Sequence, residues 1–149
     1  MWTRVGVFVL CSAAVAFGQD APPPPFEAAA GQRQIAQRFV DQRLAVWRER
    51  LKLQDWAISV VLTEKLPHGT LGAIDWDKSK RTATIFALDP SAYQAPLDAI
   101  LDDLELTVVH ELVHLDLTAL PRGQASRGSE ERAVSGIAAA LLGLDRKDR

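Results

Sequence analysis

The chain has 149 residues, which suits one domain of ordinary size. Hydrophobic residues make up 48% of the chain and charged residues 24%, proportions that exclude wholesale disorder and a collagen-like repeat. A formal net charge of −2 argues against a dedicated nucleic-acid binder, and a single cysteine excludes an intramolecular disulfide and a zinc site built from cysteines.

The first 18 residues are typical of a secretory signal peptide. Arg4 supplies a positive charge, and residues 5–17 form an apolar run that is shorter than the roughly 20 residues a membrane-spanning helix needs. Small residues favour cleavage after Gly18, which also removes Cys11, the only cysteine. We therefore predict a protein of the periplasm or the medium, with no stable membrane insertion after signal removal. The alternative, a buried N-terminal strand, is disfavoured by the prolines that follow.

Residues 19–29 are predicted to be a proline-rich spacer, because prolines 22–25 favour an extended chain without a core of its own. A short inhibitory pro-segment is the other role open to these residues. The domain itself is expected over residues 30–149. It begins with a helical pattern that reaches about Leu53 and carries many arginines beside an apolar stripe. We interpret this basic face as a solvated surface, paired in part with acidic neighbours, rather than as a nucleic-acid site.

Three strand-like segments follow the first helix, at residues 56–62, 71–76 and 82–88, and the polar connection between the last two has the length of a hairpin loop. Two further helices are predicted at residues 96–120 and 129–144. The chain is therefore expected to be an α+β domain, with a small, mostly antiparallel sheet of three strands.

The second predicted helix carries the residues that indicate chemistry. His110 and His114 are four residues apart, so both imidazoles lie on one helix face and can reach one metal ion. Glu111 projects to the side, where it can hold a water molecule rather than the metal. One zinc ion suits a site of nitrogen and oxygen ligands with an open position. The alternative is a helix whose histidines merely pack, and the apolar flanks disfavour it because unsatisfied polar groups there are costly.

The residues around the motif follow a known pattern at Thr107, Leu112, Val113 and Leu115. In these positions, and in its order of backing helix, small sheet and active-site helix, the chain resembles the zincin metallopeptidases. Asp116 departs from that pattern, in which the position is usually apolar. No histidine follows His114 and the only methionine is Met1, so the metzincin branch is excluded. The resemblance is to the gluzincins, in a minimal single-domain form.

The gluzincin resemblance implies a glutamate from the last helix as third metal ligand. Glu131 and Glu130 are the two candidates. We favour Glu131, because it stands at the family's usual distance before an apolar-Ala-Ala-x-Leu-Leu stretch, whereas Glu130 shifts that frame by one residue. The family often has an acid four residues after the ligand to orient a histidine. Ser135 occupies that place here, so this support is weaker or comes from elsewhere.

The resemblance implies a secreted zinc metallopeptidase, acting as a monomer on a peptide or protein. Zinc on His110, His114 and Glu131 would activate a water, with Glu111 as general base. The segment 82–88 is expected to be the edge strand that pairs with an extended substrate. A non-proteolytic zinc-binding module and a partner-binding domain on the same scaffold are the alternatives. Four residues are candidates for stabilising the oxyanion: His68, Tyr93, Arg122 and Arg127. For His68, a role as a turn residue is the simpler interpretation.

Overall fold

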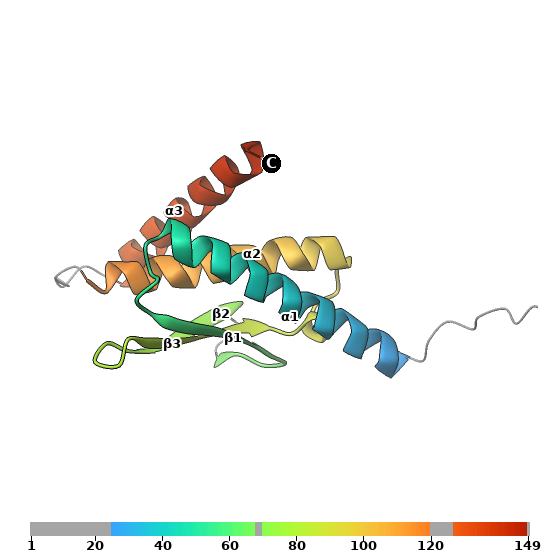
Figure 1. The fold of residues 1–149 in the computed structure, drawn as a ribbon. Coiled ribbons are helices and arrows are strands. Elements are labelled where there is room, and N and C mark those ends of the chain that lie inside the picture. Colours follow the sequence, from blue (N-terminus) through green and yellow to red (C-terminus); the bar gives the residue numbers. More distant parts are fainter. Residues whose placement is uncertain (1–24, 68–69, 120–126, 149) are drawn as a thin grey trace, which may run out of the picture.

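A computed structural model describes residues 25–67, 70–119 and 127–148 of the chain (Figure 1). The predicted signal peptide and residues 19–24 of the predicted spacer lie outside the described residues. Three helices and a sheet of three strands confirm the predicted α+β class. The elements are α1 (Pro25–Arg50), β1 (Ala57–Thr63), β2 (Gly72–Asp77), β3 (Thr82–Leu88), the short 3-10 helix η2 (Pro90–Ala92), α2 (Leu97–Leu117) and α3 (Arg127–Lys147).

Helix α1 begins inside the range predicted as spacer and ends in a well-defined cap. The backbone N–H of Leu53 donates to the carbonyl of Arg48 at 2.9 Å, and that of Lys52 donates to Glu49 at 3.1 Å. Lys52 has a φ of 59°, the left-handed conformation that this type of helix end requires. The cap turns the chain back so that β1 runs beneath the helix.

The sheet is mixed, with strand order β1-β3-β2. Strands β2 and β3 form the predicted hairpin, in antiparallel register from Gly72 opposite Ala87, whereas β1 runs parallel to β3. The expectation that segment 82–88 is an edge strand is wrong, because β3 lies in the centre and β2 forms one of the two edges. The hairpin forces β2 onto one side of β3, which leaves the other side of β3 for β1.

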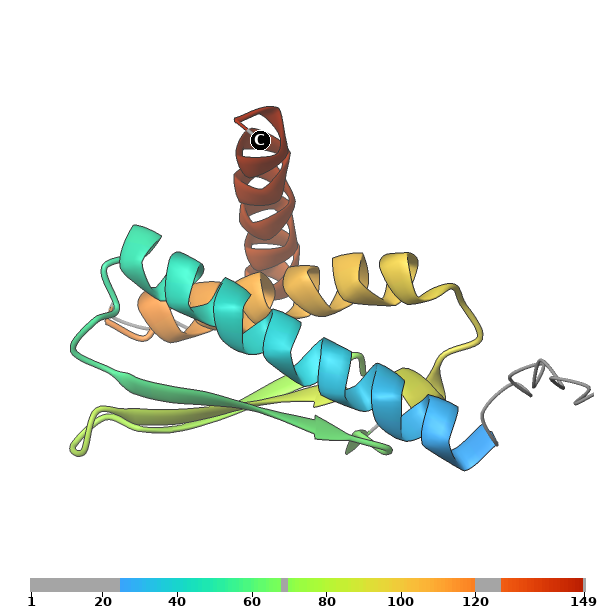
Figure 2. The same ribbon diagram turned by 45° about the vertical axis from the view of Figure 1, so that its right-hand side comes forward.

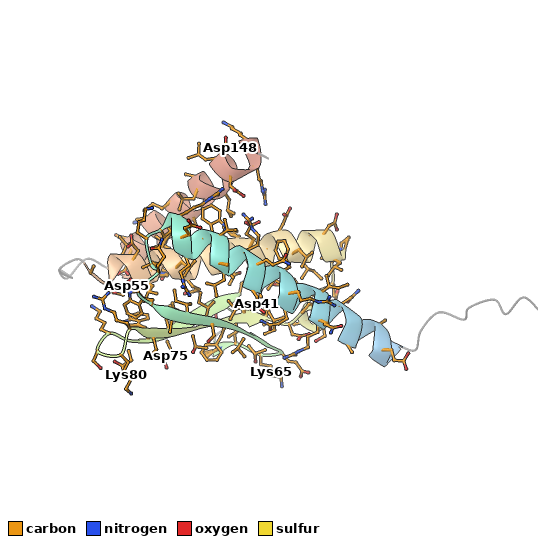
Figure 3. All side chains as sticks on the ribbon, viewed as in Figure 1. Asp41, Asp55, Lys65, Asp75, Lys80 and Asp148 are labelled. Atoms are coloured by element: carbon orange, nitrogen blue, oxygen red, sulfur yellow. The ribbon has the colours of Figure 1, made fainter. Side chains whose placement is uncertain are left out.

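The hairpin loop is held by its own side chains. Asp77 accepts hydrogen bonds from the backbone N–H groups of Ser79 at 2.9 Å and Lys80 at 3.2 Å, and the Ser79 hydroxyl heads the interactions that lower the Asp77 pKa. Lys80 points away from the fold at this end of the molecule (Figure 3). Lys78 reaches back instead, and its Nζ donates to the carbonyl of Thr118 at 2.6 Å, which ties the loop to the end of α2.

Helices α1 and α2 lie on one face of the sheet, and α3 crosses α2 and extends away from the strands (Figure 2). Alternate residues of the strands face these helices, so Ile85 in β3 is fully buried. Trp47 of α1 and Leu104 and Leu112 of α2 pack in the same core. Helix α3 contributes Val134, so that all three helices share one hydrophobic core.

An ionic cluster joins the three helices where α1 passes α2 and α3. Arg43 contacts Glu105 of α2 and, at 2.8 Å, Asp145 of α3. Trp47 also donates to Glu105 at 2.9 Å, and Arg50 contacts Asp145. Both carboxylates are buried, so these bonds satisfy charges that would otherwise be costly inside the protein. The cluster anchors the C-terminal end of α3 against α1.

The outer edge of β1 is covered by side chains of α1. Alternate residues of β1 bond to β3, as the contact from the Asp89 N–H to the Thr63 carbonyl at 2.8 Å indicates. The carbonyls of Val60 and Leu62 therefore point away from β3. Gln37 donates to the first at 3.1 Å and Arg33 to the second at 2.8 Å. These side chains therefore hinder the addition of a further strand at this edge of the sheet.

Candidate metal centre

Helix α2 brings the two histidines together on its exposed side. The Nε2 atoms of His110 and His114 are 3.2 Å apart, and the ring planes are inclined by 67°. The opposite side of α2 is packed into the core through Val108, Val109 and Leu112, which are fully buried. The histidines are therefore carried by a helix whose position is fixed by the core. Asp116, the departure from the zincin pattern, is exposed to solvent.

Glu131 of α3 faces both histidines. Its Oε2 lies 3.3 Å from Nε2 of His110, and its Oε1 lies 3.1 Å from Nε2 of His114. These three residues form a group whose ligand atoms all lie within 4.8 Å of one another. The structure thus brings together the three metal ligands proposed from the sequence.

The spacing of these atoms fits a tetrahedral zinc ion. Ligand atoms about 2.05 Å from a tetrahedral zinc are, by simple geometry, about 3.3 Å from one another. The two Nε2 atoms are 3.2 Å apart, which agrees with this geometry, and each of them lies 3.1–3.3 Å from a different oxygen of Glu131. Two imidazole nitrogens and one carboxylate are also a donor set that zinc accepts while keeping a fourth position open. The three residues could therefore hold one metal ion, and their donor atoms are of the kinds that zinc accepts.

Glu130 lies on the other side of the His114 ring. Its Oε1 is 3.4 Å from Nδ1 of His114, whereas Glu131 approaches Nε2 of the same ring. The sequence left these two neighbouring glutamates as alternatives for one role, and the structure gives them different positions. Sequence reasoning missed the contact of Glu130, and no sequence pattern could have shown which ring nitrogen each glutamate faces.

Glu111 projects to the side of the two histidines and is 7% exposed. Burial raises its pKa to about 7, with a further rise from the negative charge of Glu131 and an opposing effect of His114. A carboxyl with a pKa near neutrality can both accept and return a proton under ordinary conditions. Its position and its pKa therefore suit a general base.

The imidazole of His110 is kept neutral by its surroundings. Burial lowers its pKa, the positive charge of a protonated His114 lowers it further, and Glu131 opposes both effects. A neutral imidazole is the form that binds a metal ion, because only then does a ring nitrogen offer a free electron pair.

The three ligands line a cavity of about 650 Å³ between β2, α2 and the start of α3. Leu71 and Leu106 give it apolar walls that remain open to solvent. The strand along this cavity is β2 and not β3, which corrects the strand expected to meet an extended substrate. Gly72 of β2 is a further residue that sequence reasoning missed, although a glycine within a strand is a known signal of close backbone approach.

The candidates for oxyanion stabilisation are only partly placed. Tyr93 donates a hydrogen bond to Asp103, a residue of the cavity wall, at 2.7 Å. Burial and then this carboxylate raise the Tyr93 pKa, so the hydroxyl keeps its proton. Arg127 is the first residue of α3. His68 and Arg122 lie outside the described residues.

Comparison with protein families, with curated proteins and with solved structures finds no match for this chain. Within the described ranges, none of the helices has the length and hydrophobicity needed to cross a membrane.

Proposed function

We propose that this protein is a zinc-dependent peptide hydrolase that is exported from the cytoplasm. The observation that carries the proposal is the spacing of 3.1–3.3 Å among the Nε2 atoms of His110 and His114 and the carboxylate of Glu131, with buried Glu111 alongside. Export rests on the first 18 residues alone, and sequencing of the purified protein from the N-terminus should begin at Gln19.

In this proposal, Glu111 is the residue that moves protons. Zinc, when bound, supplies Lewis acidity and lowers the pKa of water at its open position. The carboxylate of Glu111 would take a proton from the attacking water and later pass it to the leaving amine. Burial raises the pKa of Glu111 to about 7, so its carboxylate binds a proton more strongly than an ordinary glutamate does. Near neutral pH it can still release that proton again.

The substrate would lie in an extended conformation along β2. This strand borders the cavity, and exposed sheet edges bind extended peptides through backbone hydrogen bonds. The other edge of the sheet is covered by Gln37 and Arg33. Since side chains such as Leu71 and Leu106 form the cavity walls, we expect apolar substrate side chains to be accepted there.

A non-proteolytic zinc-binding module is the second candidate. One observation favours it: among the described residues that line the cavity, none is a lysine, an arginine or a tyrosine. Such side chains, or suitably placed backbone N–H groups, are needed to stabilise an oxyanion in peptide hydrolysis. Tyr93 reaches the cavity wall only through its hydrogen bond to Asp103.

The test combines metal analysis with cleavage of a peptide library. We expect the wild-type protein to bind one zinc ion per chain and to cleave peptides, and the variant Glu111→Gln to keep zinc and lose cleavage. A variant at an exposed glutamate of α1, Glu49→Gln, serves as the matched control and should cleave normally. Zinc binding without cleavage by the wild type would favour the binding module, and failure of the wild type to bind zinc would refute both candidates.

A further inference from the structure

We propose that Glu130 is a positioning residue that holds the ring of His114 through its Nδ1 atom, so that Nε2 faces the metal. The inference rests on the proposed function, because it assigns a role within the same zinc site. It is a separate claim from the identity of the third ligand, since it concerns the nitrogen of His114 that does not face Glu131.

The geometry of α3 gives the two glutamates their different tasks. They are consecutive residues, yet Glu131 approaches the Nε2 atoms of both histidines, whereas Glu130 approaches Nδ1 of His114. The His114 ring therefore lies between two carboxylates from the same helical turn. The ring itself is largely buried, with 13% of its side chain exposed, whereas the side chain of Glu130 is 30% exposed. A contact from the more exposed Glu130 can thus orient this partly buried ring.

A carboxylate at Nδ1 determines which nitrogen carries the proton. When Oε1 of Glu130 accepts a hydrogen bond from Nδ1–H, the neutral ring must leave Nε2 free of a proton, with its electron pair available. Such partners of metal-binding histidines fix ring orientation and make the ligand more basic. The distance of 3.4 Å between Glu130 and Nδ1 is at the long end of hydrogen bonding, so small adjustments when a metal binds would shorten it.

This arrangement also accounts for Ser135. The residue four positions after Glu131 is not an acid in this chain, and it is exposed on α3. The support that a carboxylate would give from that position is provided instead by the residue directly before the ligand.

The alternative role for Glu130 is that of a negative charge at the start of α3, where the helix dipole stabilises acidic residues. The two roles predict different behaviour for Glu130→Gln. A glutamine keeps an oxygen that can accept from Nδ1–H but loses the charge. A positioning role is therefore rescued by glutamine, whereas a helix-charge role is lost equally in Glu130→Gln and Glu130→Ala.

The experiment measures zinc affinity by competition with a chelator of known affinity, for the wild type and the variants Glu130→Ala, Glu130→Gln and Glu131→Ala, with Glu49→Ala as control. We expect Glu130→Ala to lose roughly 10- to 100-fold in zinc affinity, and Glu130→Gln to recover most of that loss. Glu131→Ala should lose more than either, and Glu49→Ala should match the wild type. Circular dichroism checks that each variant is folded.

Nitrogen-15 NMR of the zinc-loaded proteins gives a second readout. We expect a slowly exchanging Nδ1–H proton on His114 in the wild type and in Glu130→Gln, and its loss in Glu130→Ala. Unchanged zinc affinity and an unchanged Nδ1–H signal in Glu130→Ala would overturn the inference while leaving the zinc site intact. Equal losses of affinity in the alanine and glutamine variants would overturn it in favour of the helix-charge role. A wild type without zinc affinity would refute the proposed function, and this inference with it.

Discussion

Gly72 of β2 lies directly against Glu111 of α2. A Cβ atom at Gly72 would be 2.9 Å from Oε1 of Glu111 and 2.4 Å from Cγ2 of Thr107. The first distance involves the end of a side chain, but the second involves a β-branched residue that is buried within a helix and has little freedom to rotate. The absence of a side chain at Gly72 is therefore what lets the strand lie beside the proposed base.

We expect Gly72→Ala to lower stability and peptide cleavage without lowering zinc binding. The added methyl group must push β2 away from α2 or displace Glu111, and overpacking of this kind costs roughly 1–3 kcal/mol. Thermal unfolding should therefore begin at a lower temperature, and peptide cleavage should fall sharply. Zinc stoichiometry should stay at the wild-type value, because the atoms nearest to an added Cβ belong to Thr107 and Glu111 and not to the three proposed ligands.

The variant Thr107→Ser provides the corresponding rescue. Serine lacks the Cγ2 atom that the new methyl group would meet at 2.4 Å. The double variant Gly72→Ala with Thr107→Ser should therefore regain part of the lost stability. If the double variant is no more stable than the sum of the two single changes implies, the contact between these positions does not limit the packing of β2.

Removing Asp145 should destabilise the whole domain. Asp145 is buried and contacts Arg43 and Arg50, so Asp145→Ala leaves Arg43 without one of its carboxylate partners in a largely buried setting. We expect a loss of roughly 2–4 kcal/mol in the free energy of unfolding, measured with urea. The matched control is Asp102→Ala, which removes an exposed partner of Arg146 and should cost less than about 0.5 kcal/mol. Similar losses in both variants would contradict a special role for the ionic cluster.

The raised pKa of Glu111 predicts a stability penalty in the metal-free protein. In the folded state the pKa is about 7, against 4.5 for an ordinary glutamate, so the folded protein binds more protons than the unfolded chain between these values. The contribution of this residue to stability therefore falls as the pH rises from 4.5 to 7, and the full penalty, on the order of 3 kcal/mol, is present above pH 7.

Glu111→Gln removes this penalty, and urea unfolding in the presence of a chelator measures it. The variant should be more stable than the wild type at pH 8.5, and the difference should shrink towards pH 5. Because His110 is present in both proteins, its lowered pKa, which acts in the opposite direction, cancels in the comparison. A stability difference that stays constant from pH 5 to 8.5 would show that Glu111 titrates normally.

Removing zinc should loosen one end of α3 more than the other. The N-terminal end carries Glu130 and Glu131, which lie against the histidines, whereas the C-terminal end is held through Asp145. We expect hydrogen exchange at residues 127–133 to become faster after chelation, while residues near Asp145 change little. Exchange that accelerates equally along α3 would indicate that the metal stabilises the helix only as a whole.

The positions of the helices and strands along the chain were easier to predict from the sequence than the order of the strands in the sheet. The range 82–88 agrees with β3 in both of its ends, because β-branched residues and Asp89-Pro90 mark the strand clearly. The sequence of this range could not show that β3 lies between β1 and β2. Alternation along a strand indicates which residues lie on its two faces, but not which strands lie at its edges. The error about the substrate strand follows directly from this limit.

The same contrast holds in the site. The proximity of His110 and His114 was predictable, because their spacing is local to one helix turn. The role of Glu105 was not predictable in this way, because it is buried and bonded to Arg43 and Trp47 of another helix. That pairing joins residues far apart in the sequence, so it depends on how α1 and α2 pack.

The covered edge of β1 has a consequence for how copies of this protein can meet. Gln37 and Arg33 occupy two of the carbonyls through which another strand would add, so a second molecule could extend the sheet through β1 only by displacing these side chains. The other edge of the sheet is β2, the strand that borders the cavity. If β2 binds an extended substrate as proposed, a second copy that added its own strand there would compete with the substrate for the same backbone groups.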